Sequence, residues 1–237
     1  MNLKGLAFFL IIMLMLATVA CQNDESYPAD ENESGLVADV DGNVYHTVTI
    51  GSQVWMAENL IVTHFSNGDP IPNITENTDW AALTTPAYCF YENNSSTYGI
   101  VYGALYNWYT VDPASNGNKN ICPDGWHIPT EAEWTTLTTY LGGSSVAGGK
   151  MKEAGTSHWS APNTGANNSS AFTALPGGYR AYTNGTFDNI GIFAHWWSST
   201  QADASLAWGE GLFTMENPAN HSTSMKKNGF SIRCVKD

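Results

Sequence analysis

The segment Cys122-Pro-Asp-Gly-Trp-His-Ile-Pro-Thr-Glu-Ala-Glu-Trp134 contains the clearest start of a helix in this chain. Thr130 and Glu133 have the spacing of a capping box, in which each side chain accepts a backbone N–H of the other residue. Gly142-Gly143 is the expected end of this helix. The apolar residues between these limits recur at helical spacing and predict one buried face: Trp134, Leu137 and Leu141.

Before this helix the sequence alternates as strands do. Residues 36–40, 44–50 and 53–56 are separated by Asp41-Gly42 and Gly51-Ser52, which are turn sequences. They predict a three-stranded antiparallel meander.

The remaining segments predict further strands, a long loop at 64–80, and helices at 102–110 and 146–153. Helices among antiparallel strands indicate the α+β class, with two main helices and long loops. The further strands are expected at 88–91, 171–175, 178–183, 191–198, 205–214 and 229–236.

The first residues predict export and a lipid anchor. Lys4 precedes an apolar run, and small residues lead to Cys21, so residues 1–20 are expected to be a signal peptide. A cysteine directly after the cleavage site is typical of bacterial lipoproteins, whose acyl chains hold the protein on a membrane. Residues 21–35 are then an acidic tether and residues 36–237 one domain. We expect a bacterial outer-membrane lipoprotein, which is surface-exposed if the acidic residues after Cys21 act as an export signal. The alternative for these acidic residues is an ordinary linker. The alternative for residues 1–20 is a plain secretory signal peptide with an incidental cysteine after it.

The net charge limits the classes of binding partner, and the number of cysteines limits the number of disulfides. Removal of Lys4 with the signal peptide leaves 8 basic against 22 acidic residues, a net charge of −14, which disfavours nucleic acid. We expect the membrane to be contacted only through the lipid. With Cys21 lipidated, Cys89, Cys122 and Cys234 allow at most one disulfide, and the sequence alone leaves its pairing open.

Familiar catalytic and metal-binding patterns do not occur. The six histidines lack zinc-ligand spacing, and no Gly-x-Ser-x-Gly elbow is present. The segment 39–43 begins like a calcium loop, but Val44 and Ile50 replace its turn glycine and terminal glutamate, so a hairpin turn is the preferred interpretation. We expect no cofactor or metal; calcium is possible in this compartment but not indicated. A hydrolytic site assembled from distant residues stays open.

The aromatic residues support two interpretations. Trp196, Trp197 and Trp208, with Tyr179, are candidates for a platform on which sugar rings stack. The alternative, preferred for the set, is that these rings fill a core, because each buries a large apolar area. If 196–197 is a strand, its two tryptophans face opposite sides, so at least one belongs to the core.

Seven motifs follow one another along the chain at residues 39–45, 54–60, 106–109, 122–134, 174–180, 196–200 and 229–237. In this order they resemble the FISUMP family, the Fibrobacter succinogenes major paralogous domain, over about residues 36–237. The segment 125–134 and the closing Gly229-Phe-Ser-Ile-Arg-Cys234 also resemble the formylglycine-generating sulfatase-modifying superfamily. The second resemblance implies a C-type-lectin-like fold and a disulfide between Cys122 and Cys234. The chain lacks the paired active-site cysteines of that superfamily's enzymes, so their activity is not implied.

Three functions follow as hypotheses. The leading one is a non-catalytic binding domain of an envelope lipoprotein, with glycan as the expected ligand. The second is an enzyme acting on polysaccharide or envelope material, which requires two carboxylates about 5–10 Å apart in an open cleft. The third is a structural or adhesive module that contacts an envelope protein through an exposed apolar patch.

Overall fold

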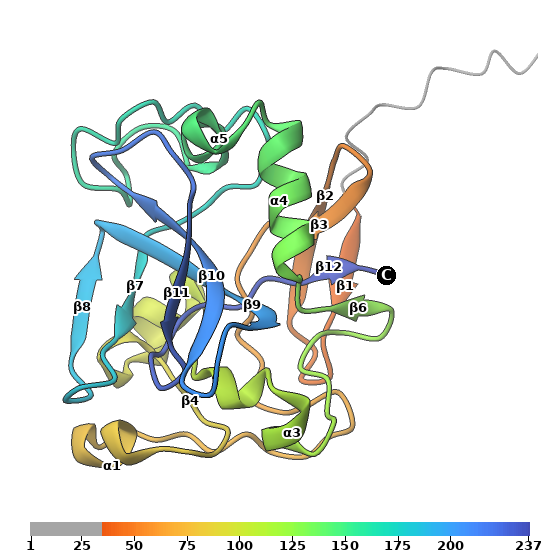
Figure 1. Cartoon of the computed structure of the whole chain (residues 1–237), viewed down its shortest axis with the longest axis vertical. Coiled ribbons are helices and arrows are strands. Elements are labelled where there is room, and N and C mark those ends of the chain that lie inside the picture. Colours follow the sequence, from red (N-terminus) through yellow and green to blue (C-terminus); the bar gives the residue numbers. More distant parts are fainter. Residues whose placement is uncertain (1–34) are drawn as a thin grey trace, which may run out of the picture. The chain divides into compact units, whose positions relative to one another are not determined.

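The computed structural model describes residues 35–237 (Figure 1). Cys21, the expected signal peptide 1–20 and nearly all of the expected tether 21–35 lie outside the described residues. The described part is α+β, with antiparallel sheets and helices.

The strands are short, and β9 and β10 are the longest of them. Their bounds are β1 Leu36–Ala38, β2 Val44–Ile50, β3 Gln53–Met56, β4 Tyr88–Cys89, β5 Leu105–Tyr106, β6 Trp126–His127, β7 Gly177–Arg180, β8 Phe187–Ile190, β9 Phe193–Gln201, β10 Leu206–Phe213, β11 Asn220–Met225 and β12 Val235–Lys236. The helices are α1 Asn77–Ala82, α2 Ile100–Tyr102, α3 Pro113–Asn116, α4 Glu131–Tyr140 and α5 Ser144–Met151. Single helical turns are η1 Tyr91–Asn93, η2 Ser95–Gly99 and η3 Trp108–Thr110.

The strands form four sheets. The largest has the order β1-β2-β3-β12-β6, so the last strand, β12, lies between β3 and β6, which are both more than 100 residues earlier in the chain. A second sheet has the order β11-β10-β9, and β4-β5 and β7-β8 are two-stranded. Helix α4 packs on β9 and β10, and Figure 1 shows it between these strands and the meander. The cavity described below is lined by residues of β7, β9, β10 and β11.

The meander and the main helix form where the local signals predict them. β1, β2 and β3 pair antiparallel in sequence order. Helix α4 begins after Thr130, with both halves of the capping box made, and Gly142 and Gly143 follow its end with positive φ. Helix α5, at residues 144–151, ends two residues before the predicted limit.

The helix predicted at 102–110 is wrong. Leu105 and Tyr106 form β5, and only the single turn η3 follows. Tyr106 exchanges backbone hydrogen bonds with Phe230, 2.8 and 3.0 Å long, in addition to its pairing with β4. Because Leu105 and Tyr106 are buried in different apolar clusters, an extended backbone serves both and a helix would not.

The strand predictions in the second half are partly wrong. Segment 171–175 is irregular: Ala171 and Thr173 have φ of 54° and 53°, which a strand does not accommodate. Of the predicted strand 229–236, only β12 is regular. β8 and β11 were not predicted; β11 is polar and half-exposed, so it lacks apolar alternation.

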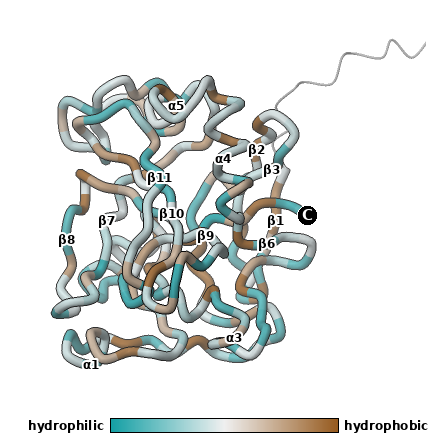
Figure 2. Tube along the Cα trace, viewed as in Figure 1, coloured by the Kyte–Doolittle hydropathy of each residue, from teal (hydrophilic) through white to brown (hydrophobic). Residues whose placement is uncertain are grey.

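Strand β9 is buried on both faces. Trp196 belongs to a cluster with Trp55, Trp134 and Phe172, whereas Trp197 belongs to a second cluster with Tyr106. Figure 2 shows that apolar residues alternate with polar ones along the trace rather than gathering in one element. Burial of aromatic rings on both sides of one strand is the main packing feature of the domain.

Candidate functional site

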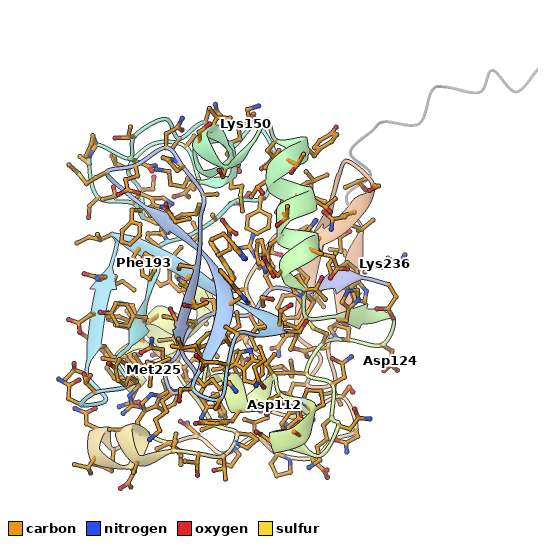
Figure 3. The ribbon with its side chains drawn as sticks, viewed as in Figure 1. Asp112, Asp124, Lys150, Phe193, Met225 and Lys236 are labelled. Atoms are coloured by element: carbon orange, nitrogen blue, oxygen red, sulfur yellow. A yellow bond between two sulfur atoms is a disulfide. The ribbon has the colours of Figure 1, made fainter. Side chains whose placement is uncertain are left out.

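A cavity of about 460 Å³ opens beside the three-stranded sheet. This volume is within the range of small-molecule sites in proteins. Phe193, labelled in Figure 3, lies in its wall on the side of β9 that faces β7. The lining residues are Tyr179, Ala181, Tyr182, Thr183, Asn189, Phe193, His195, Gly211, Phe213, Asn220, Ser222, Ser224, Asn228 and Phe230.

Strand alternation explains which residues reach the cavity. Phe193 and His195 are two apart on β9 and therefore share a face. On β10, Gly211 pairs with His195 and Gly209 pairs with Trp197. A Cβ atom at Gly209 would collide with Nε2 of His195, and one at Gly211 would lie 3.1 Å from Nδ1. The two glycines thus leave room for the imidazole ring above β10.

The floor of the cavity is aromatic. Phe193 and Phe213 have ring centroids 4.4 Å apart, and His195 lies 4.0 Å from Phe230. Tyr179 packs edge-on against both Phe193 and Phe230. Flat apolar surfaces of this kind suit a ligand that also has an apolar face.

His195 is the one imidazole in the lining and is almost completely buried. Neither of its ring nitrogens has a hydrogen-bond partner among the described residues. Burial lowers its pKa to about 3, with a further lowering by nearby His221, so the ring is neutral at physiological pH. The floor therefore holds a polar group without charge.

The rim offers hydroxyl and amide groups from β11 and the β7–β8 region. Within residues 35–237, the hydroxyls of Ser222 and Ser224 and the amide of Asn189 make no side-chain hydrogen bond. Asn228 uses its Oδ1 to accept from the backbone N–H of Tyr182 at 3.0 Å, which leaves its NH₂ group uncommitted. Such groups can bind the hydroxyls of a polar ligand.

The described lining contains no Asp, Glu, Lys or Arg. A larger hollow of about 530 Å³ beside Gly51 has Tyr140 as its one aromatic ring. The cavity beside β9 therefore combines an aromatic floor with an uncharged polar rim, and it is the candidate site.

The structure does not bring the four predicted platform residues together. Tyr179 lines the cavity, as a site residue should. Trp196 and Trp197 are fully buried, which corrects their assignment to a ligand platform, because β9 is covered on both faces. Trp208 is half-buried, and its ring stacks on His221 at 4.6 Å and 6°. It alternates with Gly209 and Gly211, so it lies on the sheet face opposite the cavity.

Sequence reasoning missed most of the aromatic floor. Phe193, Phe213 and Phe230 come from three different strands or loops, and no spacing in the sequence links them. The uncommitted polar residues of β11 form no motif. The period-2 pattern of 193–197 was the one signal that could have suggested a shared face.

Two histidines each bridge a pair of carboxylates near the start of α4. His221 lies 3.3 Å from both Glu131 and Glu210. Hydrogen bonding to Glu210 raises the pKa of His221, and burial raises the pKa of Glu210. Neither carboxylate lines the cavity, and the imidazole fills the space between them, so this arrangement is not the open cleft that a hydrolase needs.

The second histidine, His127, lies 2.8 Å from Glu133 and 2.6 Å from Asp237. Burial opposes its charge, but the hydrogen bonds to Asp237 and Glu133 raise its pKa overall. These contacts join α4 to the end of the chain. Their geometry indicates a role in stability rather than catalysis.

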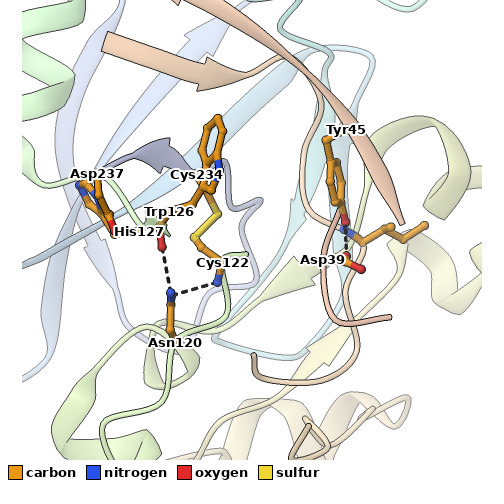
Figure 4. The surroundings of a disulfide bond; sticks show 9 residues. Asp39, Tyr45, Asn120, Cys122, Trp126, His127, Cys234 and Asp237 are labelled. Atoms are coloured by element: carbon orange, nitrogen blue, oxygen red, sulfur yellow. Dashed lines mark hydrogen bonds and ion pairs between the residues drawn. A yellow bond between two sulfur atoms is a disulfide. The ribbon is translucent and has the colours of Figure 1, made fainter. Parts of the chain in front are cut away.

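Cys122 and Cys234 form a disulfide, which is the pairing that the superfamily resemblance implied (Figure 4). Asn120 supports it: its Oδ1 accepts the Cys122 N–H at 3.0 Å and its Nδ2 donates to the Trp126 carbonyl at 2.8 Å. Cys89 is free and fully buried, and burial raises the pKa of its thiol to about 12. It is therefore not a nucleophile at neutral pH.

Half of the basic side chains are buried and serve the fold: Lys152, Arg180, Lys226 and Arg233. Lys152 donates to the carbonyls of Thr164, Phe213 and Glu216 at 2.7–3.0 Å. Eight basic residues lie within 35–237, so four remain to offset the acidic surface. Of the 17 acidic residues in the same range only Asp39 and Glu210 are buried, so the surface of this part of the chain carries a larger acidic excess than its composition.

Within the described residues, no helix has the length and apolarity required to cross a membrane. The same part of the chain contains no group of three or more His, Cys, Asp or Glu side chains arranged to hold a metal ion.

Comparison with known proteins identifies a family. The model of the Fibrobacter succinogenes major domain matches residues 48–236. No curated protein and no solved structure matches the chain.

Proposed function

Because the chain belongs to the Fibrobacter succinogenes major domain family, whose model spans residues 48–236, we propose that it is a non-catalytic glycan-binding module of the bacterial envelope. The observation that carries the proposal is the cavity beside β9, with its aromatic floor and uncommitted hydroxyl and amide groups. Sugar rings have an apolar face and a polar edge, and both find partners there.

A C-type-lectin-like arrangement is the fold that we propose for the domain. The disulfide between Cys122 and Cys234 supports this, as does a main helix that starts just after the first of these cysteines. This fold serves many unrelated functions, so it does not by itself identify a ligand.

We further propose that Cys21 carries the lipid and that the domain is held at the outer membrane through the 21–35 tether. Metabolic labelling of the full-length protein with radioactive palmitate tests this. Cys21→Ser should abolish the label and move the protein to the soluble fraction, whereas Cys89→Ser should keep both label and membrane association. A membrane-bound, unlabelled wild-type protein would contradict the lipid anchor.

A glycan array probed with the full-length protein in detergent, with calcium and with chelator, tests the binding proposal. Tyr182 is exposed and lines the cavity, whereas Tyr140 is exposed elsewhere. We expect saturable binding that Tyr182→Ala weakens about tenfold and that Tyr140→Ala leaves unchanged. Equal binding by both variants would place the ligand outside this cavity. A blank array at high protein concentration would favour the structural or adhesive hypothesis.

A further inference from the structure

We propose that the cavity beside β9 accepts an uncharged saccharide and excludes acidic sugars and sugars with a free, charged amine. The inference rests on the proposed glycan-binding function and names the ligand class of that same site. Three features of the structure carry it: the composition of the lining, the surroundings of His195, and the sidedness of β11.

The lining offers nothing that compensates a ligand charge. None of its described members is ionic, and the buried ring of His195 is neutral. A carboxylate, sulfate or ammonium group that leaves water for such a cavity loses its hydration without gaining an ion pair. A hydroxyl group, by contrast, replaces its hydrogen bonds to water with hydrogen bonds to uncharged protein groups.

The polar groups that are present suit hydroxyls. Ser222 and Ser224 can each donate and accept, and the amides of Asn189 and Asn228 add further donors and acceptors. At the floor, both ring nitrogens of His195 are buried and lie against Gly209 and Gly211 of β10, so they are not offered to a ligand. The imidazole is neutral and therefore forms an ion pair with neither sign of ligand charge.

The aromatic rings determine how a sugar would lie. The closely packed pair Phe193 on β9 and Phe213 at the end of β10, with the ring of Tyr179 on β7, supplies apolar surface at one end of the cavity. The hydroxyl-bearing residues Ser222 and Ser224 lie on the same face of the sheet, on its edge strand β11. A pyranose ring with its apolar face on the aromatic side therefore presents its hydroxyls to β11.

Strand β11 also provides a matched pair of positions for the test. Ser222 and Thr223 are adjacent and exposed, but Ser222 lines the cavity whereas Thr223 pairs with Trp208 on the other face. A lysine introduced at either position adds the same charge to the same edge strand. Only the lysine at 222 places that charge at the cavity.

The experiment measures binding of matched oligosaccharides to the full-length protein in detergent by calorimetry, at low and high salt. The pairs are mannose with mannuronic acid hexamers, galactose with galacturonic acid hexamers, and N-acetylglucosamine with glucosamine hexamers. We expect at least one neutral member to bind more than tenfold tighter than its charged counterpart, with little salt dependence. Ser222→Lys should improve binding of the corresponding uronic acid about threefold or more, and Thr223→Lys should not.

The outcomes separate the two proposals. Equal or tighter binding of the charged members, weakened by Tyr182→Ala, would overturn the neutral-ligand inference while leaving a glycan-binding cavity. No binding of any member, neutral or charged, would overturn the glycan proposal itself. An equal effect of Ser222→Lys and Thr223→Lys would show that the response comes from overall charge and would also overturn the inference.

Discussion

The indole nitrogen of Trp196 donates a 2.7 Å hydrogen bond to Oδ1 of Asn59, 137 residues earlier in the chain. The same oxygen accepts from Nε and Nη2 of Arg233, at 3.2 and 2.9 Å. Arg233 is buried, has no carboxylate partner within residues 35–237, and lies over the ring of Phe172. One amide oxygen therefore accepts from a buried indole and a buried guanidinium together, and Nη1 of the same guanidinium donates to the Phe172 carbonyl.

Asn59→Ala should destabilise the domain by at least about 3 kcal/mol, because it leaves one neutral and one charged buried donor without this acceptor. Chemical denaturation monitored by tryptophan fluorescence measures the change. Asn67→Ala, in an exposed turn, is the control and should cost less than about 1 kcal/mol. Similar losses at both positions would contradict a central role for Asn59.

The capping box should contribute measurably to stability. Thr130→Ala removes the acceptor for the Glu133 N–H, so we expect a loss of about 1 kcal/mol. Thr135→Ala, on the exposed side of the same helix, should change stability by less than about 0.5 kcal/mol. Thermal unfolding of the two variants distinguishes the cap from a general effect of losing a threonine; equal values would argue against the cap.

The disulfide should be the largest single covalent contribution to stability. It links positions separated by 112 residues, and the chain-entropy model gives about 4–5 kcal/mol for a loop of that size. Reduction should lower the unfolding free energy of the wild-type protein by an amount of this order. Cys89→Ala should respond to reductant as the wild type does, and the Cys122→Ala/Cys234→Ala double variant should not respond. A reductant effect that persists in the double variant would contradict this assignment.

Acid should destabilise the domain through His195. Its pKa is about 3 when folded and near 6.5 when unfolded, so between these values only the unfolded chain binds the proton. Above pH 6.5 the titration of His195 costs no stability. As the pH falls below 6.5, the free energy of unfolding decreases by about 1.4 kcal/mol per pH unit. His195→Phe removes this titration but keeps Glu210 and His221. Between pH 7 and 4.5 the wild-type protein should lose about 2–3 kcal/mol of unfolding free energy relative to the variant. A difference between the two proteins that does not change with pH would contradict the prediction.

Local chemistry alone accounts for part of this fold. The meander follows from alternating residues separated by Asp41-Gly42 and Gly51-Ser52, and the start of α4 follows from Thr130 and Glu133. In each case the deciding contacts lie within a few residues, so the sequence contains them directly. The disulfide pairing was different, because it came from resemblance to a superfamily rather than from the spacing of the cysteines.

The candidate site depended on contacts that no local pattern contains. Alternation correctly placed Trp196 and Trp197 on opposite faces of a strand, but it did not reveal that both faces are covered. Segment 102–110 has helical spacing, yet pairing of Tyr106 with Phe230 makes residues 105–106 extended. The cavity itself needs Gly211 beneath His195 and the polar edge strand β11 beside it.

The sequence by itself determined the α+β class, the meander, the main helix and an acidic surface, since turn chemistry, capping and charge act over short distances or by simple summation. Tertiary structure decided which aromatic rings are core and which line a cavity, because burial depends on what packs against a face from elsewhere in the chain. Tyr179 and Trp197 are both large aromatic residues on strands, and only the packing of β7 and β9 distinguishes a site residue from a core residue.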